Sequence, residues 1–190
     1  SIPQGATRSL FSIRISPSVD NGVPAPYGQR EIVNRMQLIL RTLDVAALVP
    51  PNASTQYNLL ARIIINGITY NAPVGSANSV TAWTNAVNSA AGVVNSSFAQ
   101  IADYSFAGGT SQTYGGEITG GFFIGSGANS IDLSAVRDLG NSILGGGYEP
   151  YPHRNVYPDG PDVLTVLVTN VGNVGTATVL GRLSWTEAQA

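Results

Sequence analysis

Segments in which apolar and polar residues alternate recur along the chain and predict half-buried β-strands. Ser9–Ser16 has an apolar face of Phe11, Ile13 and Ile15 and a polar face of Ser12, Arg14 and Ser16. Phe98–Phe106 and Glu117–Gly125 follow the same pattern. In the first, Ala102, Tyr104 and Phe106 share one face; in the second, the expected inward positions are Ile118, Phe122 and Ile124. The glycines of the second segment also predict a bulge or close backbone packing.

Arg30–Leu48 fits two periodicities. A helical stripe would contain Ile32, Met36, Ile39 and Leu43, whereas a strand would alternate Met36, Leu38 and Leu40 with Gln37 and Arg41. Because no good helix cap precedes this segment, we favour a long strand.

Near the end of the chain, two apolar strands, Asp162–Asn170 and Thr176–Ala190, flank a turn rich in Gly and Asn and predict a closing hairpin. The last strand must be held by the rest of the sheet, because untethered termini fray.

Asn66-Gly67, inside Tyr57–Asn71, predicts a tight hairpin, because this pair suits a type I′ turn in which both central residues have positive φ. Such a turn would pair Ile65 with Ile68 and Ile63 with Tyr70. The apolar residues of both arms then share one face: Leu59, Ala61, Ile63, Ile65, Ile68 and Tyr70.

Helical spacing is clearest in Ser130–Gly147. Its stripe would contain Leu133, Val136, Leu139 and Ile143. Asp132 is the expected N-cap, and the glycines at 145–147 are expected to end the helix. Ala77–Val94 also has apolar residues at helical spacing, but its many Asn, Ser and Thr residues weaken helices, so a short helix or an ordered loop is expected there.

These segments amount to about seven to nine short strands, separated by turn signals, with one or two short helices. They predict a mainly β fold, an antiparallel β-sandwich, with the jelly roll as one form of it. The length of 190 residues fits a single domain over 1–190, with residues 1–8 a candidate extended N-terminal arm. The first residues lack an initiator Met and a signal-peptide pattern, so we expect a processed chain or a piece of a longer one.

Composition points to a weakly charged surface. Charged residues make up 11% of the chain, against about 25% in typical soluble domains, and all the basic residues are arginine. Such a surface repels neighbouring copies little and favours a protein packed among other proteins; a secreted β-domain with a neutral surface is the alternative. The net charge of −2 offers no basic face for nucleic acid, and no apolar run of membrane-spanning length is present. Cysteine is absent, which excludes disulfides.

Catalytic chemistry has little support in the sequence. The chain contains one histidine, His153, and no G-x-S-x-G motif, so a Ser-His-Asp hydrolase has little support. The absence of lysine excludes a P-loop and a Schiff-base nucleophile. We therefore expect no enzyme, no catalytic residue, no cofactor and no metal. Glycoside hydrolysis needs only two carboxylates, and Asp103, Glu117, Asp159 and Asp162 keep it open as an alternative. Asp159 and Asp162 could also bind Ca²⁺, although acids that hydrogen-bond their own turn are the favoured interpretation.

One loop gathers aromatic and basic residues. Its members are Tyr148, Tyr151, His153, Arg154 and Tyr157. Aromatic and arginine side chains are enriched where proteins bind one another, and a sugar-stacking site would use the same residues. The alternative is that the tyrosines fold back over the edge of the sandwich.

Three stretches, taken together, resemble structural proteins of tailed bacteriophages, in particular the large contractile-tailed phages of marine cyanobacteria. They are Arg30–Val45, Ser130–Gly147 and Tyr157–Asn170, followed by Gly181–Ala190 at the end of the chain. In that family, similar blocks occur near the C-terminus of virion proteins.

The resemblance implies a virion component, in the capsid decoration, a fibre or the tail and baseplate, that has no cofactor. Its expected partners are other copies of itself, with a trimer favoured, and neighbouring virion proteins. The alternative function is a receptor- or carbohydrate-binding module of a fibre or spike, with a host surface glycan as partner.

Overall fold

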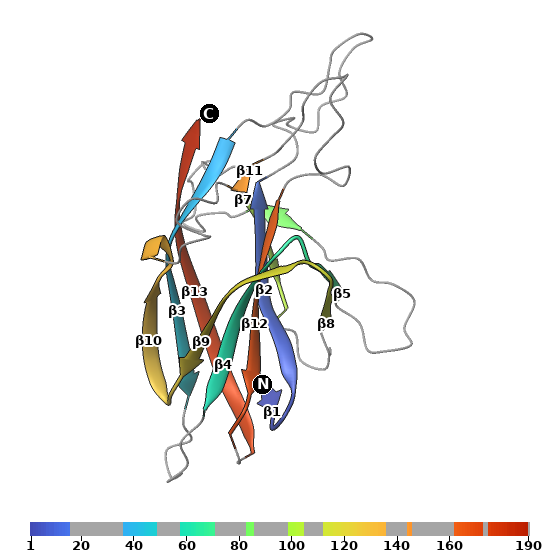
Figure 1. The fold of residues 1–190 in the computed structure, drawn as a ribbon, viewed down its shortest axis with the longest axis vertical. Coiled ribbons are helices and arrows are strands. Elements are labelled where there is room, and N and C mark those ends of the chain that lie inside the picture. Colours follow the sequence, from blue (N-terminus) through green and yellow to red (C-terminus); the bar gives the residue numbers. More distant parts are fainter. Residues whose placement is uncertain are drawn as a thin grey trace, which may run out of the picture.

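The computed structural model describes residues 1–15, 36–48, 58–70, 83–85, 99–104, 112–135, 144–145, 162–172 and 175–189. These residues are mostly β-strand, and one 3₁₀ turn, η1 (Leu133–Ala135), is the single helical element among them. Two antiparallel sheets face each other and confirm the predicted β-sandwich (Figure 1).

The first sheet has five strands, with the order β1-β13-β3-β10, and β11 pairs with β3 as well. Its strands are β1 (Ile2–Pro3), β3 (Met36–Leu48), β10 (Gly127–Asp132), β11 (Leu144–Gly145) and β13 (Thr176–Gln189). The long strand predicted within Arg30–Leu48 is confirmed over the described β3. The expected tethering of the last strand is also confirmed, because β13 pairs with β3 from Thr178 to Gln189.

The second sheet has six strands, with the order β6-β7-β2-β12-β4-β9. Its strands are β2 (Thr7–Ile15), β4 (Leu59–Ile65), β6 (Thr84–Asn85), β7 (Ala99–Asp103), β9 (Glu117–Ile124) and β12 (Val163–Asn170). A separate two-stranded sheet pairs β5 (Ile68–Tyr70) with β8 (Gln112–Tyr114).

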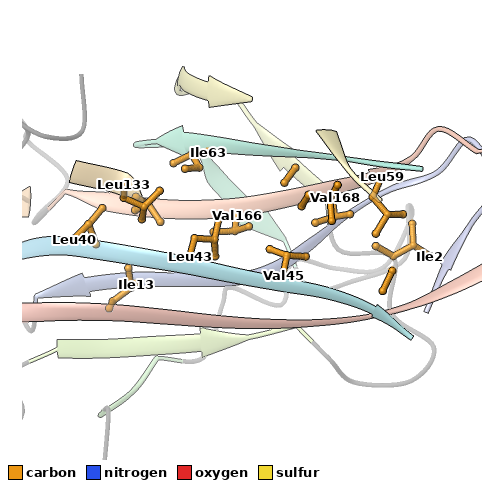
Figure 2. Close-up of a cluster of buried hydrophobic side chains, with 14 of the residues drawn as sticks. Ile2, Ile13, Leu40, Leu43, Val45, Leu59, Ile63, Leu133, Val166 and Val168 are labelled. Carbon is orange, nitrogen blue, oxygen red and sulfur yellow. The ribbon is translucent and has the colours of Figure 1, made fainter. Parts of the chain in front are cut away.

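The core lies between the two large sheets, and Figure 2 shows Leu43 and Val45 of β3 close to Val166 and Val168 of β12. Burial of one such side chain contributes about 1.5–3 kcal/mol. The inward positions of β3 change phase at Arg41, because Ser184 of β13 pairs with Thr42 whereas the next residue of β13 pairs with Leu40. Arg41 is therefore the extra residue of a bulge and stays exposed. Leu40 before the bulge and Leu43 after it both keep their side chains in the core.

The hairpin predicted around Asn66-Gly67 is wrong. Both edges of β4 are occupied, by β12 on one side and β9 on the other, so β5 cannot pair with it and instead pairs with β8. Asn66 does have positive φ, 57°, but its side chain bonds sideways: Asn66 Nδ2 donates to Asp162 Oδ1 (2.9 Å), and Val163 N donates to Asn66 Oδ1 (2.9 Å). These bonds fix the end of β4 to the start of β12.

The predicted closing hairpin is also wrong, because β12 and β13 belong to different sheets. The chain crosses between the sheets after Asn170, whose side chain is fully buried. Asn170 Nδ2 donates to the carbonyl oxygens of Ile2 (3.1 Å) and Gly175 (3.2 Å), and its Oδ1 accepts from Gly172 N (3.2 Å). The side-chain amide of Asn170 thus ties the crossover to β1 and to the residue before β13.

The α-helix predicted over Ser130–Gly147 is wrong where that segment is described. Ser130–Asp132 belongs to β10 and Leu144–Gly145 to β11, and both strands pair with the same side of β3. Pairing with a buried strand overrides the helical spacing. Asp132 does cap η1 as predicted, because its Oδ1 accepts from Ser134 N (2.9 Å) and Ser134 Oγ (2.6 Å).

Three further predictions concern shorter stretches. β2, β7 and β9 are confirmed as strands, but Ile118 of β9 points outward rather than inward. A register shift between Ile63 and Ile64, opposite Gly120 and Ile118, reverses the alternation there, which agrees with the predicted bulge. Within Ala77–Val94, the described residues include the short strand β6 instead of a helix. Residues 1–8 contain β1, which pairs with β13, and the first two residues of β2.

Candidate interaction surfaces

The residues predicted to form an aromatic and basic site lie outside the described part of the chain. They are Tyr148, Tyr151, His153, Arg154 and Tyr157. The binding role assigned to them from the sequence therefore stays a prediction.

Two of the candidate carboxylates, Asp103 and Glu117, lie far apart in the six-stranded sheet. Asp103 ends β7 and Glu117 begins β9, and three strands lie between these two in the sheet. At about 4.8 Å per strand their backbones are roughly 19 Å apart, beyond the separation that glycosidases use. Asp162 accepts a hydrogen bond from Asn66, and Asp159 lies outside the described residues. The described residues hold no cluster of three or more acidic, His or Cys side chains suited to a metal ion.

A row of hydroxyl groups runs along the outer face of the six-stranded sheet, the face that points away from the core. Ser12 Oγ lies 2.7 Å from Thr165 Oγ1 and 2.9 Å from Tyr104 Oη. All three side chains are buried. The polar face predicted for β2 is thus correct in its phase, but Ser12 is buried rather than solvated. Buried hydroxyls that satisfy one another stabilise and orient strands, so their role is structural.

Arg14 continues this outer face at the next outward position of β2. Its Nε donates to Gln100 Oε1 (2.9 Å), and its guanidinium carbon lies 4.3 Å from the centre of the Trp83 ring, a cation–π contact. Burial lowers the pKa of Arg14 from its ordinary value. Sequence reasoning missed this cluster, because the strand that follows Trp83 comes from a stretch interpreted as helix or loop.

Large apolar side chains are exposed at two places on the described strands. On β9, Phe123 is 81% exposed and Ile118 is 61% exposed. On the outer face of the five-stranded sheet, Leu180 (56% exposed) and Leu48 (47% exposed) lie close together, because β13 and β3 pair there. We name these the β9 patch and the β13–β3 patch. Exposed apolar side chains are candidate contact sites for another protein where they form a contiguous patch.

The β13–β3 patch is bordered by few charges. Arg182 Nε lies 3.9 Å from Asp44 Oδ2, and these two residues pair directly across β13 and β3. The neighbouring positions facing outward on β10 are Ala128 and Ser130. This face therefore carries few charges, which suits contact with another protein surface.

Comparison with protein-family models, curated proteins and solved structures finds no match for this chain. In the described residues, no helix has the length and apolar character needed to span a membrane.

Proposed function

We propose that the chain is a structural component of a bacteriophage particle, in the capsid decoration, a fibre or the tail and baseplate. It acts by self-association and by docking on neighbouring virion proteins. The resemblance of three sequence blocks to phage structural proteins suggests this class. The observation that carries the proposal is the exposure of Phe123, Ile118, Leu180 and Leu48 on regular strands, in a chain with 11% charged residues.

The mechanism follows from burial of those side chains at contacts between subunits. A large apolar side chain contributes about 1.5–3 kcal/mol when it leaves water, and closed symmetric assemblies repeat each contact. A weakly charged surface adds little electrostatic repulsion between copies. The sandwich supplies rigid strands that hold these side chains in fixed positions, so binding costs little ordering of the partner surfaces.

The first test is the solution mass of the purified chain by light scattering, measured over a range of concentrations. One chain is 19.7 kDa, so the favoured trimer would be about 59 kDa. Phe123→Ser should weaken association about ten-fold or more if the β9 patch is a contact. The matched control is Gln4→Ser, an exposed position between β1 and β2 that belongs to neither patch.

Particle membership has its own readout. Peptides of this chain should be found by mass spectrometry in virions purified from the source of the gene. A chain that stays monomeric at every concentration, and that is absent from purified virions, would contradict the proposal.

A further inference from the structure

The longest strand in the described part of the chain, β13, pairs with the other described strands mainly along one side. β13 contains 14 residues, and along one side it pairs with β3 from Thr178 to Gln189. On its other side β1 pairs with Thr176 and Ala177. No other strand in the described part of the chain pairs with that side. Figure 1 shows β13 as a long strand that runs from the β1 end of the sandwich to the C-terminus. An open strand edge presents unpaired backbone groups to another chain.

The remaining described sheet edges are less suited to pairing. β1, β6 and β11 have two residues each, β5 and β8 have three, β10 has six, and β9 has a bulge next to Gly120 and Gly121. By contrast, the irregularity in the β13–β3 ladder places its extra residue, Arg41, in β3, so β13 itself runs without interruption. β13 also contains no proline and no lysine, the residues with which proteins protect open edges.

We propose that β13 pairs antiparallel with β13 of a second copy of this chain, about a two-fold axis at Ser184. The two five-stranded sheets would then join into one continuous sheet. This inference rests on the self-association in the proposed function and names the surface that carries it. A two-fold axis perpendicular to the sheet keeps both inner faces on the same side, so residues of like orientation face each other.

Self-complementarity of the strand selects this register. With Ser184 opposite its own copy, Leu183 faces Trp185 of the second copy, and the reverse pair forms on the other side of the axis. Both side chains are only partly buried in the single chain, where they pack against the core. On the outer face, Leu180 faces Ala188. Apolar and aromatic cross-strand pairs of this kind stabilise sheets.

Charges exclude the neighbouring registers. An axis at Arg182 would place Arg182 directly opposite itself, and an axis at Leu183 would bring the two copies of Arg182 into diagonal contact. An axis at Trp185 would place Leu183 opposite Glu187. With the axis at Ser184, Arg182 faces Thr186, and the two arginines lie roughly 14 Å apart along the strands. Since like charges directly opposite are destabilising, the register at Ser184 is favoured.

Cysteine cross-linking tests the axis directly, because the chain contains no cysteine of its own. Directly opposed residues have Cα atoms about 4.5–5.5 Å apart, within the range that a disulfide spans. Ser184→Cys should therefore give, on mild oxidation, a disulfide-linked dimer of about 39 kDa, twice 19.7 kDa. The matched control is Thr178→Cys, on the same strand and the same outward face, whose two copies would lie roughly 40 Å apart and should not cross-link. Equal cross-linking of both variants, or none of Ser184→Cys, would overturn the register.

A charge series tests the interface without a covalent bond. Thr186 is exposed, its Oγ1 accepts a hydrogen bond from Arg41 Nε of its own chain (3.3 Å), and it would face Arg182 of the second copy. Thr186→Lys should weaken dimerisation about ten-fold or more, whereas Thr186→Glu should strengthen it by a similar factor; both are measured by light scattering. Identical effects of the two variants would contradict the proposal.

The mass separates this inference from the proposed function. A two-fold contact gives even-numbered assemblies, such as a dimer of about 39 kDa or a pair of trimers of about 118 kDa. A trimer of about 59 kDa in which Ser184→Cys does not cross-link would overturn the β13 contact and leave the proposed function standing. A monomer at every concentration would contradict both.

Discussion

The two large sheets differ most on the faces that point away from the core. On the six-stranded sheet the middle of this outer face is buried: Ser12 and Thr165 have no exposed surface, and Ile64 and Tyr104 are also buried. On the five-stranded sheet the outer face is open, and Leu180 is 56% exposed there. The six-stranded sheet is thus covered over β2 and β12, although its edge strand β9 exposes Phe123 and Ile118, whereas the five-stranded sheet presents a face and an edge to solvent.

The cover of the six-stranded sheet includes the two-stranded sheet. Ser9 Oγ of β2 lies 2.9 Å from Thr113 Oγ1 of β8. The turn after β8 packs against Ile64, since a Cβ built on Gly116 would lie 2.7 Å from Ile64 Cγ2. The contrast teaches that interaction surfaces of this molecule are to be sought on the five-stranded sheet and on the edge strand β9, where nothing described covers them.

The largest effect on stability is expected at the turn after β8, where it packs against the six-stranded sheet. Gly116 has φ of +77°, and a Cβ there would lie 2.6 Å from both Gly67 N and Ile65 O. Gly116→Ala should therefore lower the free energy of unfolding by about 3 kcal/mol or more, measured by denaturant unfolding. The neighbouring Gly115, at φ +67° with nothing within 4 Å of its Cβ, is the control, and Gly115→Ala should cost about 1 kcal/mol. Equal losses would mean that the close packing of this turn contributes nothing.

A pair of serines compares the two outer faces directly. Ser12→Ala removes the partner of two buried hydroxyls, those of Thr165 and Tyr104, and should cost about 1–3 kcal/mol. Ser130→Ala, at an exposed position on β10, should change stability by less than about 0.5 kcal/mol. If thermal unfolding shows the same shift for both variants, the outer face of the six-stranded sheet is not buried in solution.

Strands were predictable from the sequence because each is set by its own alternation. β2, β7, β9 and the described part of Arg30–Leu48 all form where the pattern places them. Pairing was not predictable in the same way. The Asn66-Gly67 turn and the turn after Asn170 have the local signals of hairpins, but β4 and β12 are central strands whose edges are occupied by partners distant in sequence.

The described parts of the candidate surfaces were harder to foresee. Alternation identifies two faces of a strand, but it does not say which of them another element covers, so Ser12 and Arg14 were assigned to solvent. The same limit hid the opposite case, Ile118, whose exposure depends on a register shift with β4. The open edge of β13 depends on the order of strands in the sheet, which no local pattern encodes.

The smallest difference in stability is expected between two arginine variants, one on the outer face of each sheet. Arg182 is 79% exposed in its side chain and lies 3.9 Å from the Asp44 carboxylate, so Arg182→Gln should change the unfolding free energy of the single chain by less than about 0.5 kcal/mol. Arg14 is partly buried, stacks on Trp83 and donates to Gln100, so Arg14→Gln should cost about 1 kcal/mol. Both are measured by urea unfolding at a concentration that keeps the chain monomeric. Since solvent and salt screen an exposed pair, raising the ionic strength should remove the small effect at Arg182 and leave most of that at Arg14. A loss at Arg182 as large as that at Arg14 would show that the outer face of the five-stranded sheet is covered in solution.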